Sequence, residues 1–240
     1  MPPTGFIPRP RARIPRFALS PIQRQRRTFL SSILSSSPLP PQTLTASRRL
    51  PYNHVALYGL IADIDSYSDF LPYCSTSRVT AWTAHEDPEF GRRWPTRADL
   101  TAGWGGLEQT YTSRVFCVPG SIVEALSGDG ARSGIAPDVL ARYGLRDEPS
   151  SVPAESGNDG DEGVFRTLVT RWAVTPVIPD KSGEDGVVRP GRQGDWSDIN
   201  LNIRFQFANP LYGAVSSAVA DKIAPIMIEA FVKRAKMILG

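Results

Sequence analysis

Three acidic side chains at short spacing are the first candidates for chemistry in this sequence. Asp63, Asp65 and Asp69 fall within one short stretch, and paired carboxylates can act as general acid and base. Asp also caps helices, because its side chain accepts hydrogen bonds from the free backbone N–H groups of a first turn. No Gly-x-Ser-x-Gly motif or Ser-His-Asp order accompanies them in the sequence. We therefore expect caps and a solvated face, and no catalytic residue.

The side chains that bind metals are too few and too widely spaced for a metal site. The chain has two cysteines, Cys74 and Cys117, and two histidines, His54 and His85. Neither histidine has a further ligand at the spacing that zinc sites use. We expect no metal, and we interpret both cysteines as small buried hydrophobic residues rather than as a disulfide framework.

A few polar or aromatic residues could meet a ligand. Ser113 and Thr170 are expected to point inward by alternation, where each hydroxyl group could bond a ligand oxygen or a neighbouring carbonyl group. Trp104 is flanked by glycines, which fits either an aromatic gate to a cavity or a core residue at a bend of the sheet. The sequence leaves both pairs of alternatives open.

Charge is distributed very unevenly along the chain. Residues 1–62 contain nine Arg and no Asp or Glu, whereas the remainder carries 18 Lys and Arg against 24 Asp and Glu, a net charge of about −6. A broad basic surface for phosphate contacts is not indicated, so nucleic acid is not an expected partner. No apolar run reaches the roughly 18 residues that a membrane span needs.

The N-terminal region has the composition of an organellar transit peptide. It is rich in Arg and Ser, and Arg27, Phe29 and Ser32 fit a two-step mitochondrial presequence motif. A plain basic tail is the alternative, because early prolines prevent a long helix. We place residues 1–45 outside the fold, as transit peptide and disordered tail, and expect cleavage between about residues 28 and 36. Residues 46–240 are expected to form one domain.

The start of this domain reads as two short helices. Asn53 can cap a helix within residues 50–63, and the apolar stripe of this helix is expected to consist of Val55, Leu57, Tyr58, Leu60 and Ile61. Residues 65–72 add a second amphipathic turn that ends at Pro72.

From Ser75 onward, hydrophobic and polar residues alternate with the period of a half-buried strand. The clearest strand, residues 200–207, places Leu201, Ile203, Phe205 and Phe207 on one face. Further strands are expected around residues 79–81, 98–104, 111–117, 123–125 and 168–174. Sequential strands of this kind form an antiparallel sheet with one face in water.

Two insertions and a long helix complete the domain. Residues 128–163 and 177–196 are rich in Gly, Pro, Asp and Ser, and we interpret them as surface loop insertions. Pro210 then begins a helix that reaches Leu239 and that Pro225 is expected to kink. The apolar face of the sheet needs this helix as its cover, which gives an α+β arrangement with an apolar cavity wherever the two separate.

Three separated segments carry a resemblance to a known family. They are residues 57–74, residues 111–115 (Tyr-Thr-Ser-Arg-Val) and residues 205–212 (Phe-Gln-Phe-Ala-Asn-Pro-Leu-Tyr). In this order they resemble the mitochondrial coenzyme Q-binding proteins of the polyketide-cyclase/START-like superfamily, over residues 47–239 without the insertions. The resemblance implies a helix-grip, START-like fold, in which a curved antiparallel sheet wraps around a long C-terminal helix, with two short helices after the first strand. The insertion 128–163 departs from the compact form of the family and leaves the shape of the cavity mouth open.

The resemblance also implies a function. Ubiquinone (coenzyme Q) is the expected ligand, with no further cofactor, and the protein is expected to act as a lipid carrier or chaperone in respiratory electron transport and quinone biosynthesis. Its expected place is the matrix side of the mitochondrial inner membrane, as a peripheral protein, with respiratory or quinone-biosynthesis complexes as further partners. The alternatives are a cyclase- or hydrolase-like enzyme of the same fold, and an adaptor that binds ribosomes or a respiratory complex. The expected cavity-lining residues are Tyr67, Phe70, Leu71, Leu100, Trp104, Tyr111, Val115, Leu168, Trp172, Leu201, Ile203, Phe205, Val219, Ile223 and Met227.

Overall fold

The computed structural model describes residues 40–104, 107–128, 130–147, 165–178, 196–208 and 210–240, without the side chains of Trp104, Leu107 and residues 210–221. In this part of the chain, seven antiparallel strands form one sheet in the order β1-β7-β6-β5-β4-β3-β2. The strands are β1 (Gln42–Leu50), β2 (Cys74–Trp82), β3 (Pro95–Trp104), β4 (Leu107–Val118), β5 (Ile122–Ser127), β6 (Phe165–Pro176) and β7 (Ser197–Phe207).

Three short helical segments follow β1. They are α1 (His54–Ala62), the 3₁₀ turn η2 (Ile64–Ser66) and α2 (Tyr67–Phe70). The predicted cap of α1 is confirmed, because the Asn53 side chain accepts a hydrogen bond of 2.8 Å from the backbone N–H of Val55. The helix accordingly begins at His54, directly after this cap.

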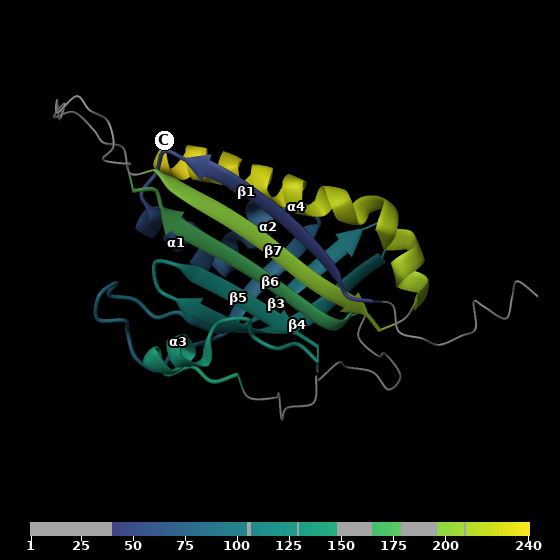
Figure 1. The fold of residues 1–240 in the computed structure, drawn as a ribbon, viewed down its shortest axis with the longest axis horizontal. Helices are drawn as coiled ribbons and strands as arrows, with labels where there is room; N and C mark the ends of the chain where they lie inside the picture. Colours follow the sequence, from purple (N-terminus) through teal and green to yellow (C-terminus); the bar gives the residue numbers. More distant parts are fainter. Residues whose placement is uncertain (1–39, 105–106, 129, 148–164, 179–195, 209) are drawn as a thin grey trace, which may run out of the picture. The chain divides into compact units, whose positions relative to one another are not determined.

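The C-terminal helix α4 (Pro210–Leu239) contains Pro225. Figure 1 shows it running alongside β1 and β7 and bending in its N-terminal part. Together with α1 and α2, α4 covers one face of the sheet, here called the inner face. No helix among the described residues is both long and apolar enough to cross a membrane.

The strand β1 corrects the predicted start of the domain. It begins at Gln42, inside the region that we had placed outside the fold, and pairs with β7 from Gln42 opposite Phe205 to Leu50 opposite Ser197. Leu44 and Leu50 are buried on the inner face. The physical reason is a ladder of hydrogen bonds to a strand far away in the sequence, which no local pattern reveals. Residues 1–39, with the predicted presequence motif, lie outside the described residues.

The opposite, outer face of the sheet is not simply exposed to water. Residues 130–147, which we had interpreted as part of a loop insertion, include α3 (Pro137–Arg142). A second hydrophobic cluster joins this segment to the sheet; its buried members are Phe116, Val118, Leu126, Ala131, Ile135, Leu140 and Val169. The expectation of a face wholly in water was therefore wrong, because the outward residues of β4, β5 and β6 include large apolar side chains that need a cover.

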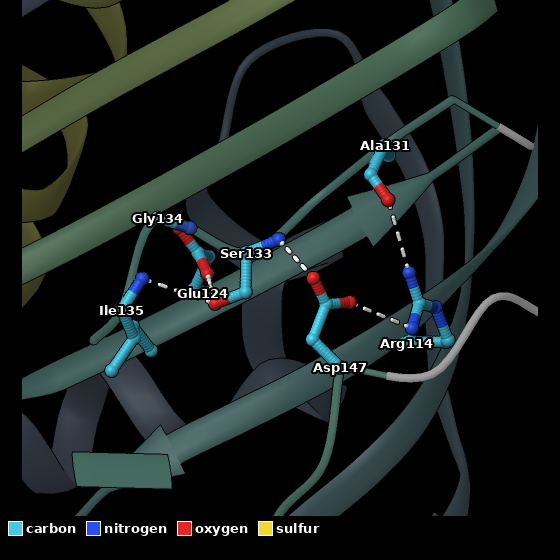
Figure 2. A network of polar contacts seen from close by, with 7 residues as sticks. All are labelled: Arg114, Glu124, Ala131, Ser133, Gly134, Ile135 and Asp147. Carbon is cyan, nitrogen blue, oxygen red and sulfur yellow. Dashed lines mark hydrogen bonds and ion pairs between the residues drawn. The ribbon is translucent and has the colours of Figure 1, made fainter. Parts of the chain in front are cut away.

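A network of charged groups holds this cover in place (Figure 2). Glu124 of β5 is completely buried, and its carboxylate accepts hydrogen bonds from Arg171 (2.6 and 2.9 Å), from the Ser133 hydroxyl (2.5 Å) and from the Gly134 N–H (3.3 Å). A buried carboxylate is tolerated only when it is paired and bonded in this way. A Cβ atom at Gly134 would lie 2.4 Å from an Arg171 guanidinium nitrogen, so a larger residue there would require the Arg171 side chain to shift away from its place beside Glu124.

A second ion pair extends the same network. Arg114 of β4 pairs with Asp147 at 3.1 Å, and it also donates to the Ala131 carbonyl at 3.1 Å. Asp147 in turn accepts a hydrogen bond of 2.9 Å from the Ser133 backbone N–H. Residues 131–147 are thereby bonded to two neighbouring strands at once (Figure 2).

Candidate functional site

The inner face of the sheet carries one large hydrophobic cluster. Along β7, the side chains of Ile199, Leu201, Ile203 and Phe205 are all buried, whereas the intervening polar residues face outward. This alternation is the one that the sequence predicts. It follows from the two-residue period of a strand, because only one side of β7 meets α4 and the core.

The structure brings most of the expected lining residues together. Thirteen of the fifteen lie in a single hydrophobic cluster with α1, α2 and α4. Of the other two, Trp104 is the last residue of β3, opposite Leu107, and Val219 lies in α4; the side chains of both are outside the described part of the structure. The thirteen are Tyr67, Phe70, Leu71, Leu100, Tyr111, Val115, Leu168, Trp172, Leu201, Ile203, Phe205, Ile223 and Met227.

Burial within this cluster changes from one end to the other. Around the C-terminal half of α4, side chains such as Leu57, Ile199, Ile228 and Phe231 are at most 1% exposed. We call this region the closed half of the inner face. Towards the start of β6, the end of β7 and Ile223 of α4, the apolar side chains are only partly buried; they include Leu100, Tyr111, Phe165, Phe207, Ile223 and Met227. We call this region the open half.

Four aromatic rings line the open half. The ring of Phe165 lies 6.0 Å from that of Tyr111, 6.3 Å from that of Phe205 and 5.2 Å from that of Phe207, between centroids. Three of these contacts join edges to faces, including Phe205 to Phe207, and one is stacked. Such packing gives a large apolar area on stiff side chains, which suits the wall of a site for an apolar ligand.

Sequence reasoning missed Phe165 as part of this wall. The β6–β7 register shifts between Phe165 and Thr167. Plain alternation counted back from the inward Leu168 would turn Phe165 outward, and the bulge reverses this. Two further aromatic residues were not among the expected lining residues. Phe207 was expected on the inner face only, and Phe231 was expected only on the apolar stripe of the C-terminal helix; its ring lies 5.2 Å from that of Trp172. The bulge left no signal in the sequence that we can identify.

The polar groups on the inner face mostly bond to the protein itself. The Ser113 hydroxyl, expected as one candidate for a ligand oxygen, lies 2.7 Å from the Ser127 hydroxyl and is buried with it. Tyr67 donates a hydrogen bond of 2.5 Å to the Ile61 carbonyl. Burial raises the pKa of Tyr67 and of Tyr111 above the usual value for tyrosine, so both stay neutral at physiological pH.

The three clustered carboxylates have structural partners. Asp63 accepts a hydrogen bond of 2.6 Å from the Ser66 hydroxyl, Asp65 accepts one of 2.6 Å from the Val79 backbone N–H, and Asp69 lies 4.0 Å from Arg234 of α4. These contacts fix the η2–α2 corner against β2 and α4. They favour the structural interpretation of this cluster over acid–base chemistry.

The two cysteines are not paired, and their burial differs. Cys117 is buried on the inner face, as expected, where desolvation raises the pKa of its thiol to about 12. Cys74 is only partly buried, because it stands at the start of β2 on the sheet edge. In the described part of the chain, no group of three or more His, Cys, Asp or Glu residues is placed to hold a metal ion.

Comparison with known proteins gives the site a family context. Residues 50–132 and 151–232 match a family model described as "Polyketide cyclase / dehydrase and lipid transport". A Schizosaccharomyces pombe protein named "Coenzyme Q-binding protein coq10, mitochondrial" is 30% identical over 192 residues, which cover 80% of this chain and 85% of the relative. A Pseudomonas aeruginosa protein named "Ribosome association toxin RatA" is 27% identical over 194 residues, or 81% of this chain and 95% of that protein.

Solved structures confirm the expected fold class. The structure of a START superfamily protein from Mycobacterium smegmatis aligns with a TM-score of 0.50 and covers 81% of this chain and 97% of its own. Only 10% of the aligned residues are identical, so this likeness concerns the fold alone.

Proposed function

Because this chain belongs to the polyketide cyclase/dehydrase and lipid transport family, we propose that it binds coenzyme Q between the inner face of its sheet and α4. The choice of ligand follows the name of the Schizosaccharomyces pombe relative. The inner face suits this ligand, since a polyprenyl tail needs an apolar lining and few directional bonds.

One observation carries this proposal: a single hydrophobic cluster extends along the inner face from the closed half into the partly exposed open half. Moving a hydrocarbon chain from such a lining into water costs about 0.8 kcal/mol per CH₂ group. A polyprenyl quinone therefore cannot travel through water alone. Partly buried rings such as those of Tyr111, Phe165 and Phe207 can exchange contacts with water for contacts with a tail.

The proposed role is that of a carrier or chaperone for the quinone. The carboxylates Asp63, Asp65 and Asp69 are engaged in holding the fold, which supports a binding role rather than catalysis. In this role the protein serves respiratory electron transport and quinone biosynthesis, in the mitochondrion, where the names of its coenzyme Q-binding relatives place those proteins.

The exposed side of α4 supports a peripheral contact with the membrane. Lys222, Ile226, Lys233 and Met237 repeat at the spacing of one helix face, and all four are exposed. Glu229, which shares this face, is bonded to Arg48 of β1 at 2.6 Å. Lysines interleaved with apolar side chains suit an anionic bilayer surface such as the matrix side of the inner membrane.

Ribosome association is the second candidate function, because the Pseudomonas aeruginosa relative that carries this name is matched over nearly its whole length. The net negative charge of residues 63–240 weighs against contact with ribosomal RNA.

The decisive experiment is to express the full chain in a host that makes ubiquinone, purify it, extract it with organic solvent and identify the lipids by mass spectrometry. We expect ubiquinone to copurify at a substantial fraction of one molecule per chain. A chain that carries no quinone and instead sediments with ribosomes would favour the second candidate and contradict the first.

A further inference from the structure

Two buried tryptophans in the core differ in the state of their indole N–H groups. Trp94 is 5% exposed, and its Nε1–H donates a hydrogen bond of 3.0 Å to the Asp87 carboxylate. Trp172 is 3% exposed, and its Nε1–H has no acceptor among the described residues. A buried indole N–H normally finds a partner, so Trp172 is the exception that requires an explanation.

The surroundings of Trp172 offer the N–H little besides apolar groups. Trp172 lies on the inner face of β6, opposite Val123 of β5 and Leu201 of β7. Its ring lies 5.2 Å from the ring of Phe231, a residue of α4. The backbone carbonyl groups of a central strand are engaged in the ladders to its two neighbours. A donor in this position is complementary to an acceptor that arrives with a ligand.

A quinone head group has the matching chemistry. Its ring carries two carbonyl oxygens, which accept hydrogen bonds, and it has no N–H or O–H group of its own. The polyprenyl tail has no polar group at all. Of the other polar groups in this cluster, Ser113 and Ser127 bond to each other, and Tyr67 bonds to Ile61. Among the described residues, two buried side-chain groups have no hydrogen-bond partner: the Trp172 Nε1–H and the Tyr58 hydroxyl. Of these two, the indole N–H can act only as a donor, which is the group that a quinone carbonyl needs.

We propose that the Trp172 Nε1–H donates a hydrogen bond to a carbonyl oxygen of the bound quinone and so places the head group at the inner end of the site. This inference rests on the proposed quinone binding. Trp172 and Phe165 are separated by about 20 Å along β6. The tail therefore runs from Trp172 towards the rings of Tyr111, Phe165 and Phe207 in the open half.

The test compares the wild-type protein with Trp172→Phe, which keeps an aromatic ring and removes the donor. Delipidated full-length chain is titrated with a short-tail ubiquinone and, separately, with an isoprenoid hydrocarbon of similar length that has no head group. Loss of one neutral hydrogen bond weakens ubiquinone binding by roughly fivefold, and the affinity for the hydrocarbon stays unchanged. The melting temperature of the ligand-free variant stays within a few degrees of the wild-type value, since no hydrogen bond within the protein is lost.

Trp94→Phe is the matched control, because it removes an indole N–H that the protein itself satisfies. We expect a lower melting temperature for this variant and an unchanged affinity for ubiquinone. A second measurement, by NMR, uses the wild-type protein with ¹⁵N-labelled tryptophan. The chain has five tryptophans, and the indole N–H signal that is missing in Trp172→Phe is the signal of Trp172. We expect this signal to shift when ubiquinone is added and to stay in place when the hydrocarbon is added.

Equal affinity of wild type and Trp172→Phe for ubiquinone would overturn the inference and leave quinone binding intact. A parallel loss of affinity for both probes would also overturn it, because it would show lost packing rather than a lost donor. If the wild-type chain bound neither probe, the proposed function itself would fail.

Discussion

Both faces of the sheet are covered, but different forces hold the two covers. On the outer face, residues 130–147 pack on a hydrophobic cluster and are fixed in addition by directional bonds: Glu124 to Arg171 and Ser133, and Arg114 to Asp147. On the inner face, α4 rests on the sheet mainly through apolar side chains. Two ion pairs link α4 to the rest of the fold, Arg48 to Glu229 and Asp69 to Arg234, and they involve exposed or partly exposed groups at its margins.

This difference has a consequence for ligand binding. Apolar contacts are non-directional, so a side chain can exchange a protein neighbour for a lipid tail at little cost. A buried carboxylate cannot exchange its partners in this way, because removing any one of them leaves a buried charge or a hydrogen-bond donor without a partner. The inner face is therefore the one that can open for a lipid, and the outer face is the one that holds the sheet in shape while it does so.

The largest expected effect is at the outer face. Glu124→Ala should lower the free energy of unfolding by about 3 kcal/mol, because Arg171, Ser133 and Gly134 all lose their acceptor. Urea denaturation measures this. Asp138→Ala is the control: it breaks the exposed Arg142–Asp138 pair on α3 and should cost under about 0.5 kcal/mol. If both variants lowered the free energy of unfolding equally, the Glu124 network would not be what holds residues 130–147 on the outer face.

Binding of ubiquinone should stabilise the inner face independently of the outer one. At about 100 times its Kd, a short-tail ubiquinone should raise the free energy of unfolding by about 2.7 kcal/mol in the wild type. The same increment is expected in Glu124→Ala, because contacts on opposite faces add. Denaturation with and without ligand measures both. A much smaller increment in the variant would mean that the two covers are coupled.

Two alanines on β3 distinguish the closed half from the open half of the inner face. Ala98 is completely buried, whereas Ala102, four residues along the same face, is only partly buried. Ala98→Phe should overpack the core and cost about 1 to 3 kcal/mol. Ala102→Phe should cost under about 1 kcal/mol and should reduce copurifying quinone. Similar destabilisation by both substitutions would show that the open half is packed solid.

The smallest expected effect on the free energy of unfolding is at the exposed side of α4, where substitutions should act on membrane binding instead. The triple variant Lys222→Glu, Lys233→Glu and Lys236→Glu should weaken binding to anionic vesicles, by about 1 kcal/mol for each lysine at low salt, and hardly change binding to neutral ones. Vesicle sedimentation measures this.

The matched control for α4 is a triple variant that reverses the charge of three exposed arginines on the outer face of the sheet: Arg78→Glu, Arg97→Glu and Arg204→Glu. It makes the same change in net charge. If this control lost vesicle binding to the same extent, net charge alone would be responsible, and the assignment to α4 would be wrong.

The local pattern of the sequence was enough for the elements and for the faces that they present. Alternation assigned the inward residues of β4 and β7, Asn53 identified the start of α1, and Pro210 that of α4. These features depend on neighbours within a few residues: the two-residue period of a strand, the free N–H groups of a first turn and the fixed φ of proline. That is why thirteen of the expected lining residues occur in one cluster.

Tertiary structure alone decided the features that depend on distant partners. The sequence could not show that Gln42–Leu50 pairs with β7, that a bulge turns Phe165 inward, or that Glu124 has Arg171 and Ser133 as partners. Nor could it show that Ser113 is engaged by Ser127 while the N–H of Trp172 has no acceptor among the described residues. Each of these depends on the register in which remote strands meet. A register is a global property, because it is set by the summed burial and hydrogen bonding of the whole sheet.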